Sequence, residues 1–164
     1  MHRLYLVAAV SLLMFGCGFH LRGSGVDTDV ASVYVRAGEG VDLAAGLTRS
    51  LSQRGVEVLD SAAEAEVVID LLEQQQSGRA VSFTDRATTA EYQLDLAVRF
   101  QIVGAGEKVL VPERWVRATR TYLVDTNNLV GSDQQRRLLS GELGTDLVQQ
   151  IVRSLGAATR ANPH

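Results

Sequence analysis

The sequence predicts an α+β fold in which two helices pack on one face of a four-stranded mixed sheet, in the order β-α-β-β-β-α. Two patterns carry this prediction: residues 90–103 alternate between apolar and polar, and the C-terminal region has an apolar residue at every fourth position. The chain has 164 residues, of which 46% are hydrophobic and 21% charged, and these values favour a single globular domain.

The first strand and the first helix are predicted at residues 32–37 and 42–54. The strand alternates in polarity, and the helix has an apolar residue at every fourth position, at Leu43, Leu47 and Leu51. Asp42 is suited to the N-cap of this helix, and Gly55 to the position just after its end.

A short apolar segment at 56–59 leads to a second predicted strand at 66–75, which is rich in β-branched residues. A connection at 76–89 follows, and then the long alternating strand at 90–103. Because a helix separates the first two predicted strands, we expect a right-handed crossover that makes them parallel neighbours.

The fourth strand is predicted in two pieces, 108–111 and 114–124, and Pro112 between them indicates a bulge or a sheet edge. We expect the later strands to be antiparallel because short turns join them. Trp115 and Tyr122 are predicted to lie in the core, and contact with a partner protein is the alternative. The sheet face away from the helices is expected to be polar and open.

A loop at 125–131 is predicted before the last helix, which is capped by Ser132 or Asp133 and runs to about Gly156. Its apolar stripe consists of Leu139, Leu143, Leu147, Ile151 and Leu155. This stripe predicts the second helix that covers the sheet.

The N-terminus has the features of a secretion signal. Residues 1–3 carry positive charge, and the apolar run at 4–15 is shorter than the roughly 20 residues that span a membrane. Gly16 stands before Cys17, the only cysteine, in the manner of a lipobox, where the sulfur receives a diglyceride and the chain is cut before it. An ordinary secretory signal with a free thiol is the alternative, although such a thiol is a liability in an oxidising compartment. Position 18 is Gly and not the Asp that often retains lipoproteins in the inner membrane.

These features divide the chain into four predicted parts: a signal peptide (1–16), a lipidated linker (17–31), a folded domain (32–158) and a short tail (159–164). The acyl chains on Cys17 would anchor the domain to the bilayer, because one acyl chain binds only marginally and a lipoprotein cysteine carries three.

The composition argues against catalysis and nucleic-acid binding. The net charge is −3, and the histidines are only His2, His20 and His164. No phosphate-cradling glycine loop, metal-spaced cluster or catalytic triad is recognisable. We therefore predict that the protein is not an enzyme and uses neither a cofactor nor a metal.

Four segments resemble the lipopolysaccharide-assembly lipoprotein family LptE (formerly RlpB). They are CGFHLRG at 17–23, GVEVL at 55–59, TAEYQL at 89–94 and the helix after Asp133. Each segment is short, but together they cover nearly the whole mature chain in the right order.

The resemblance implies a lipoprotein of the outer membrane whose domain faces the periplasm and the lumen of the β-barrel LptD. Such proteins plug and help assemble this barrel, and the pair inserts lipopolysaccharide into the outer leaflet. The family fold is two helices on a four-stranded sheet, and its members are not enzymes.

The family also binds lipopolysaccharide through basic residues near one end of the domain. Arg86 is the nearest match to the basic residue that commonly precedes the TAEYQ stretch. The Lys that is common before the last helix has no counterpart in 129–132, where Arg136 and Arg137 could replace it.

Arginines of the strand at 114–124 are further candidates, because guanidinium groups pair with phosphates and carboxylates. Arg114 and Arg120 are predicted on one face, with Arg117 on the other. The alternative is that these arginines maintain solubility or pair across strands with Glu91, Asp95 or Glu113.

Two other functions fit a lipid-anchored α+β domain. One is an outer-membrane adaptor lipoprotein that activates a cell-wall enzyme. Only the short motifs argue against this adaptor function. The other is a lipid-anchored hydrolase, for which the chain offers no nucleophile and base pair.

Overall fold

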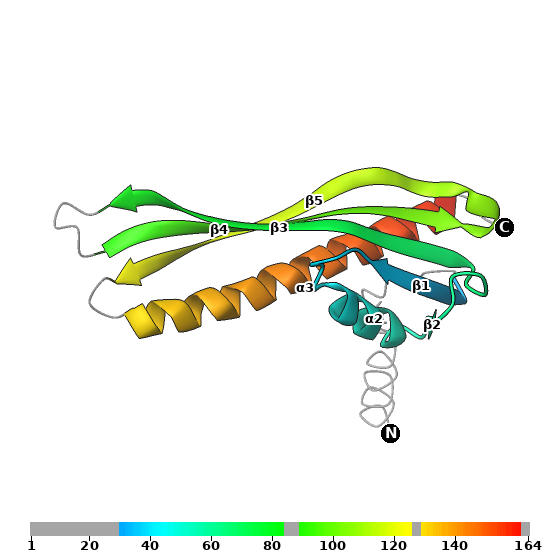
Figure 1. The fold of residues 1–164 in the computed structure, drawn as a ribbon, viewed down its shortest axis with the longest axis horizontal. Helices are drawn as coiled ribbons and strands as arrows, with labels where there is room; N and C mark the ends of the chain where they lie inside the picture. Colours follow the sequence, from blue (N-terminus) through cyan, green and yellow to red (C-terminus); the bar gives the residue numbers. More distant parts are fainter. Residues whose placement is uncertain (1–29, 84–88, 126–128, 162–164) are drawn as a thin grey trace, which may run out of the picture.

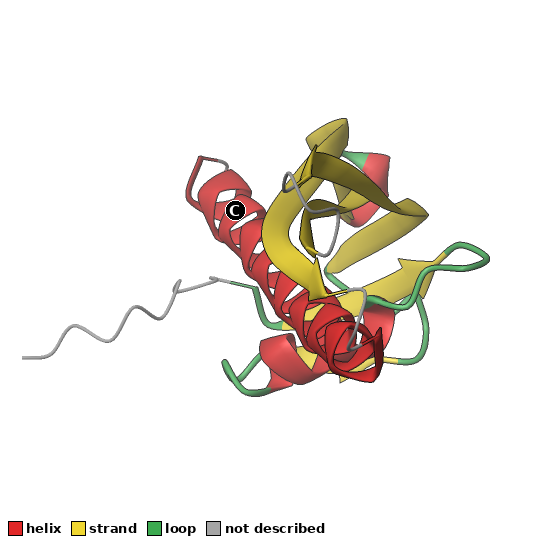
Figure 2. Ribbon diagram, turned by 90° about the vertical axis from the view of Figure 1, so that its left-hand side faces the viewer, coloured by secondary structure: helices red, strands yellow, loops and turns green. Residues whose placement is uncertain are grey.

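The computed structural model describes residues 30–83, 89–125 and 129–161, which form a sheet layer and a helix layer (Figure 1). The elements in these ranges are β1 (Ser32–Ala37), α2 (Ala44–Ser52), β2 (Glu57–Leu59), β3 (Val67–Phe83), β4 (Thr89–Gly104), a short 3-10 helix (Ala105–Glu107), β5 (Val109–Asp125) and α3 (Leu129–Ala161). The end-on view shows how strongly the sheet twists and curls (Figure 2). No helix within these ranges is both long and apolar enough to cross a bilayer.

The sheet in the described ranges has five strands in the order β2-β1-β3-β4-β5, so the prediction of four strands is wrong. The additional strand is β2, which pairs in parallel with β1, Glu57 opposite Ser32 and Leu59 opposite Tyr34. Three residues are too few to show an alternation, and only the neighbouring β1 makes this segment a strand. The α+β class, the two helices and the mixed sheet are confirmed for this part of the chain.

The predicted strand directions are confirmed. β1 and β3 are parallel, with Val33 opposite Val67, and β4 is antiparallel to both β3 and β5. The predicted end of β3 at residue 75 is wrong, because the strand continues to Phe83 through residues assigned to a connection. Pairing with β4 keeps this polar segment extended, with Ser77 opposite Asp95.

Two irregularities divide the sheet into two regions. The register of β3 with β4 shifts between Leu71 and Glu73, and the register of β5 with β4 shifts around Pro112. On β4, the two shifts lie on either side of Phe100. Pro112 thus marks both a bulge and the edge strand, as predicted.

We term the region that contains β1, β2 and α2 the base, together with the parts of β3, β4 and β5 beside them. The arm is the three-stranded remainder with the first turns of α3, made of residues 73–83, 89–99, 113–125 and 129–142. α3 runs along the base and the arm (Figure 1).

Both helices differ from their predicted ends. Asp42 does not cap α2, whose N-cap is Leu43 and has no side-chain cap; instead the Asp42 N–H donates to Gln74 Oε1 at 3.1 Å. Gly55 has a φ of 82°, as expected for a residue that terminates a helix.

α3 begins at Leu129, before the predicted cap at Ser132 or Asp133, and continues past Gly156 to Ala161. The C-terminal extension has a packing reason, since Ala158 and Thr159 are buried and the Thr159 hydroxyl donates to the Leu155 carbonyl at 3.2 Å.

The core lies between the helices and the sheet. Its fully buried side chains include Leu47, Leu51, Leu143, Leu147, Ile151, Leu155, Val33, Ile69 and Phe100. The predicted apolar stripe of α3 is therefore confirmed, except that Leu139 is only partly buried.

Candidate functional site

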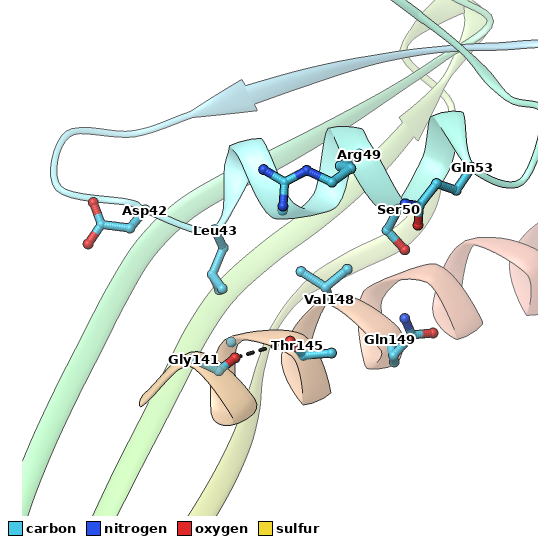
Figure 3. Close-up of a pocket in the computed structure, with 11 residues that line it drawn as sticks. Asp42, Leu43, Arg49, Ser50, Gln53, Gly141, Thr145, Val148 and Gln149 are labelled. Carbon is cyan, nitrogen blue, oxygen red and sulfur yellow. Dashed lines mark hydrogen bonds between the residues drawn. The ribbon is translucent and has the colours of Figure 1, made fainter. Parts of the chain in front are cut away.

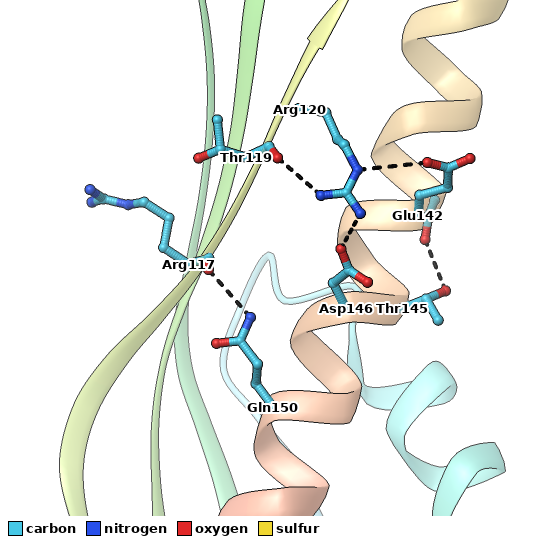
Figure 4. A network of polar contacts seen from close by, with 8 residues as sticks. Arg117, Thr119, Arg120, Glu142, Thr145, Asp146 and Gln150 are labelled. Atoms are coloured by element: carbon cyan, nitrogen blue, oxygen red, sulfur yellow. Dashed lines mark hydrogen bonds and ion pairs between the residues drawn. The ribbon is translucent and has the colours of Figure 1, made fainter.

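The two faces of β5 carry arginines with different surroundings. Arg114 points to the helices, where it bonds to Ser154. Arg120 also points to the helices, and Arg117 points to the opposite, open face of the sheet, as the alternation predicted (Figure 4). The open face carries Glu73, Gln75, Ser77 and Arg79 of β3, Gln93, Asp95, Ala97 and Arg99 of β4, and Glu113, Trp115, Arg117 and Thr119 of β5.

On the helix side, Arg120 holds β5 to α3. Its Nη2 lies 2.5 Å from Asp146 Oδ2, and its Nε lies 3.8 Å from Glu142 Oε2 (Figure 4). Arg114 Nη2 donates to Ser154 Oγ at 2.6 Å, and its guanidinium lies 5.5 Å from the Phe100 ring centre. Both predicted ligand-binding arginines therefore make contacts within the domain.

Arg117 has no such partner. Its guanidinium makes no hydrogen bond or ion pair within the described residues, and only its backbone carbonyl is engaged, accepting from Gln150 Nε2 at 3.3 Å (Figure 4). The side chain is exposed and points away from α3. Its charge is therefore available to a ligand on the open face.

Beside Arg117 the open face forms a hollow of about 280 Å³, here termed the open-face hollow. Residues from three strands line it: Gln75, Ser77, Arg79, Gln93, Asp95, Ala97 and Arg117. Ala97 is the smallest side chain of β4 on this face, and it is buried between its larger neighbours. Arg79 makes one long hydrogen bond, 3.4 Å from Nη2 to Gln93 Oε1.

Asp95 is the acidic group of this hollow. The Thr119 hydroxyl donates to its carboxylate at 2.5 Å and the Gln93 amide at 2.8 Å, and these hydrogen bonds, the one from Thr119 above all, lower the pKa of Asp95. The charges of Arg79 and Arg117 act in the same direction. Asp95 is therefore ionised at neutral pH.

Arg99 forms a separate cluster on the open face at the boundary of base and arm. It pairs with Glu113 and, at 3.0 Å, with Glu73, and the hydrogen bond that Arg99 donates to the Glu113 carboxylate raises the pKa of the guanidinium. The guanidinium also lies 5.9 Å from the ring centre of Trp115. Arg99 thus makes cross-strand ion pairs, which were the alternative role considered for the arginines of β5.

Trp115 is 41% exposed on this face, so its predicted place in the core is wrong. The alternation of β5 directs it away from the helices, and the guanidinium of Arg99 is its neighbour there. Tyr122 faces the helix side, packs against the core and lies 6.1 Å from the Tyr92 ring, as the prediction requires.

The remaining predicted site residues are not brought together by the described structure. Arg136 and Arg137 are exposed on the first turns of α3, where Arg136 pairs with Asp133 at 3.3 Å. Cys17 and Arg86 lie outside the described residues.

A second depression, of about 320 Å³, lies between α2 and α3 (Figure 3). Small residues allow the helices to approach closely there, because a Cβ on Gly144 would stand 3.3 Å from Leu43 and one on Gly46 would stand 3.7 Å from Val148. The depression follows from this close packing, and its rim mixes single charges of both signs, from Asp42 and Arg49.

Sequence reasoning missed Arg79 as a site residue. The residue lies in a segment predicted as a connection, so its face could not be assigned. Arg117 was considered but left out of the predicted site, and the alternation that separated it from Arg114 and Arg120 was the signal that could have included it.

The fold and its faces define a class of protein: a two-layer α+β domain, with helices on one sheet face and a polar surface on the other. Among the described residues, no group of three or more His, Cys, Asp or Glu side chains is placed to hold a metal ion.

The comparisons with known proteins then give the family. The model of the LptE lipopolysaccharide-assembly family matches residues 30–155, so the chain belongs to the LptE family. The LPS-assembly lipoprotein LptE of Pectobacterium atrosepticum is 28% identical over 162 residues, covering 94% of this chain and 85% of the relative. That of Yersinia pestis strain Pestoides F is 25% identical and covers 92% and 73%.

Solved structures agree. The solution structure of lipoprotein B from Nitrosomonas europaea has a TM-score of 0.74 at 25% identity and covers 88% of this chain and 94% of its own. The crystal structure of rare lipoprotein B from Shewanella oneidensis has a TM-score of 0.70 at 19% identity and covers 81% and 99%, which shows the shared fold.

Proposed function

We propose that this chain is an outer-membrane lipoprotein that plugs and assists assembly of an LptD-type β-barrel, and that the two proteins together insert lipopolysaccharide into the outer leaflet. The observation that carries the proposal is the family match, which extends over residues 30–155 and thus over nearly all of the folded domain. Curated relatives named LPS-assembly lipoprotein LptE align over more than nine tenths of the chain.

In this proposal the protein is not an enzyme. It is held in the membrane by acyl chains on Cys17, and its domain faces the periplasm and the barrel lumen. The lipobox-like segment that ends at Cys17 supports the anchor. Several acyl chains on this residue would bind a bilayer far more strongly than one.

Lipopolysaccharide contacts are proposed at Arg86, Arg136 and Arg137. The two helix residues are exposed near the end of the arm, where their charges can reach an anionic lipid. Arg114 and Arg120 already bond to Ser154 and Asp146, so fewer of their donors are open to a ligand.

The test is to capture the tagged full chain from detergent-solubilised outer membranes and to deplete it in cells. A large β-barrel should be recovered with it, and depletion should reduce lipopolysaccharide at the cell surface. Cys17→Ser is the matched control, since it removes the acylated sulfur and should release the protein from membranes that lack the barrel.

Recovery of the chain without a barrel, together with normal surface lipopolysaccharide after depletion, would refute the proposal. Recovery of a cell-wall enzyme in place of a barrel would favour the adaptor alternative.

A further inference from the structure

The open-face hollow has the chemistry of a binding site that the assembly role does not account for. Two guanidinium groups border it, Arg117 with no side-chain partner in the described residues and Arg79 with one long bond to Gln93. They come from the two outer strands of the arm, and β4 runs between them. A guanidinium with open donors is suited to a phosphate or a carboxylate.

The hollow also contains an anion, which restricts the ligand. Asp95 is one of its lining residues, and the Thr119 hydroxyl and the Gln93 amide hold its carboxylate in place. A bare anion would meet repulsion from this carboxylate. A ligand that carries hydroxyl groups beside its negative charge satisfies both the carboxylate and the arginines. Its hydroxyls can donate to the carboxylate, and its charged group accepts from the arginines.

The other lining groups suit a polyhydroxylated ligand. Gln75 and Ser77 add donors and acceptors from β3, and the small Ala97 adds an apolar contact from β4. The volume, about 280 Å³, is just below the roughly 300–1,000 Å³ of small-ligand sites, which limits the ligand to about one ring. Trp115 is not among the residues that line the hollow, but it stands two residues from Arg117 on the same face and is partly exposed.

We propose that the open-face hollow binds an anionic sugar, with Arg79 and Arg117 on its phosphate or carboxylate and Asp95 and Gln75 on its hydroxyls. The choice of ligand rests on the proposed function, because the phosphates and carboxylates of lipopolysaccharide are carried by sugars. The site lies on the sheet face away from the helices, and so differs from the contacts proposed at Arg136 and Arg137 on α3.

The test uses Trp115, the only tryptophan of the chain, as the reporter. The purified full chain in non-ionic detergent is titrated with glucose 6-phosphate, and with glucose and inorganic phosphate separately. We expect a saturable change in fluorescence with the sugar phosphate, and binding on the order of tenfold weaker for either component alone.

Substitutions locate the site. Arg117→Gln and, independently, Arg79→Gln should each weaken binding of glucose 6-phosphate on the order of tenfold, because each removes charge-assisted hydrogen bonds. Arg49→Gln is the matched control, since it removes the same charge from the exposed surface of α2 and should leave binding unchanged. Equilibrium dialysis with labelled glucose 6-phosphate measures binding independently of Trp115.

Three results would overturn the site: no retention of the sugar phosphate in dialysis, equal affinity for inorganic phosphate, or unchanged binding in both arginine variants. The assay requires no barrel, so its failure is distinguishable from failure of the proposed function. If the chain captures its barrel but retains no sugar phosphate, only the proposal of this binding site is refuted.

Discussion

The base and the arm share β3, β4, β5 and α3, yet they are stabilised differently. In the base, α2 and α3 enclose a core in which Leu47, Leu51 and Phe100 are fully buried. The arm lacks α2, β1 and β2, and it exposes Leu123 by 61%, Leu138 by 64% and Val130 by 80%. The arm does bury Leu94, Leu96 and Val98, but over fewer covering elements than the base, and it adds polar cross-links between α3 and its strands.

These cross-links are made by hydrogen bonds and ion pairs. Gln76 Nε2 of β3 donates to Ser140 Oγ at 3.1 Å, and Arg120 of β5 pairs with Asp146. Because exposed polar contacts contribute little each, the comparison teaches that the arm depends on the base for most of its stability. Four substitutions test this, from the largest expected effect to the smallest.

Leu51→Ala should destabilise the protein by about 2–5 kcal/mol, because it removes a fully buried side chain from the base and leaves a cavity. Urea unfolding followed by circular dichroism measures the loss. The matched control is Leu138→Ala in the arm, where a 64% exposed side chain should cost no more than about 0.5 kcal/mol. Equal losses would contradict the proposed division.

Gly38→Ala should cost about 1–3 kcal/mol by crowding the boundary between base and arm. A Cβ at this position would stand 2.6 Å from the Leu72 carbonyl oxygen, a backbone atom at the β3 bulge that cannot move aside cheaply. Gly141→Ala is the control, because a Cβ there meets nothing within 4 Å and alanine favours a helix by up to about 1 kcal/mol. Thermal unfolding should therefore shift in opposite directions for the two variants.

Arg120→Gln removes the ion pairs with Asp146 and Glu142, which join the strands to α3. The loss should be at most about 1 kcal/mol, since the side chains of Arg120 and Asp146 are 39% and 42% exposed. It should shrink at about 1 M salt, where charges are screened within about 3 Å. The exposed Arg137, changed to Gln, should show no such salt-dependent loss.

Asp95→Asn should have the smallest effect, and one confined to part of the pH range. The folded-state pKa of Asp95 is lowered, chiefly by the Thr119 hydroxyl, so its contribution is present above the unfolded pKa of about 3.9 and lost as pH falls through the folded value. Unfolding measured from pH 7 downward should show the parent more stable at neutral pH, with the difference vanishing under acid. A difference that grows under acid would show that the sign is wrong.

Residues with strong periodicity were predictable. The alternation of β4 and β5 placed Arg114 and Arg120 on one face and Arg117 on the other, and the structure confirms this division. The identity of their partners was not predictable, because Asp146 and Ser154 reach Arg120 and Arg114 only once α3 packs beneath the sheet. For the same reason the predicted site left out Arg117, the β5 arginine whose guanidinium is more available to a ligand.

The sequence by itself determined the class of the fold, the parallel and antiparallel order of its main strands and the family, because periodicity and short motifs are local properties of the chain. Only the tertiary structure decided that 57–59 is a strand, that β3 continues to Phe83 and that α3 starts at Leu129. Those segments have weak local preference, so the free energy of pairing and packing with distant residues selects their conformation.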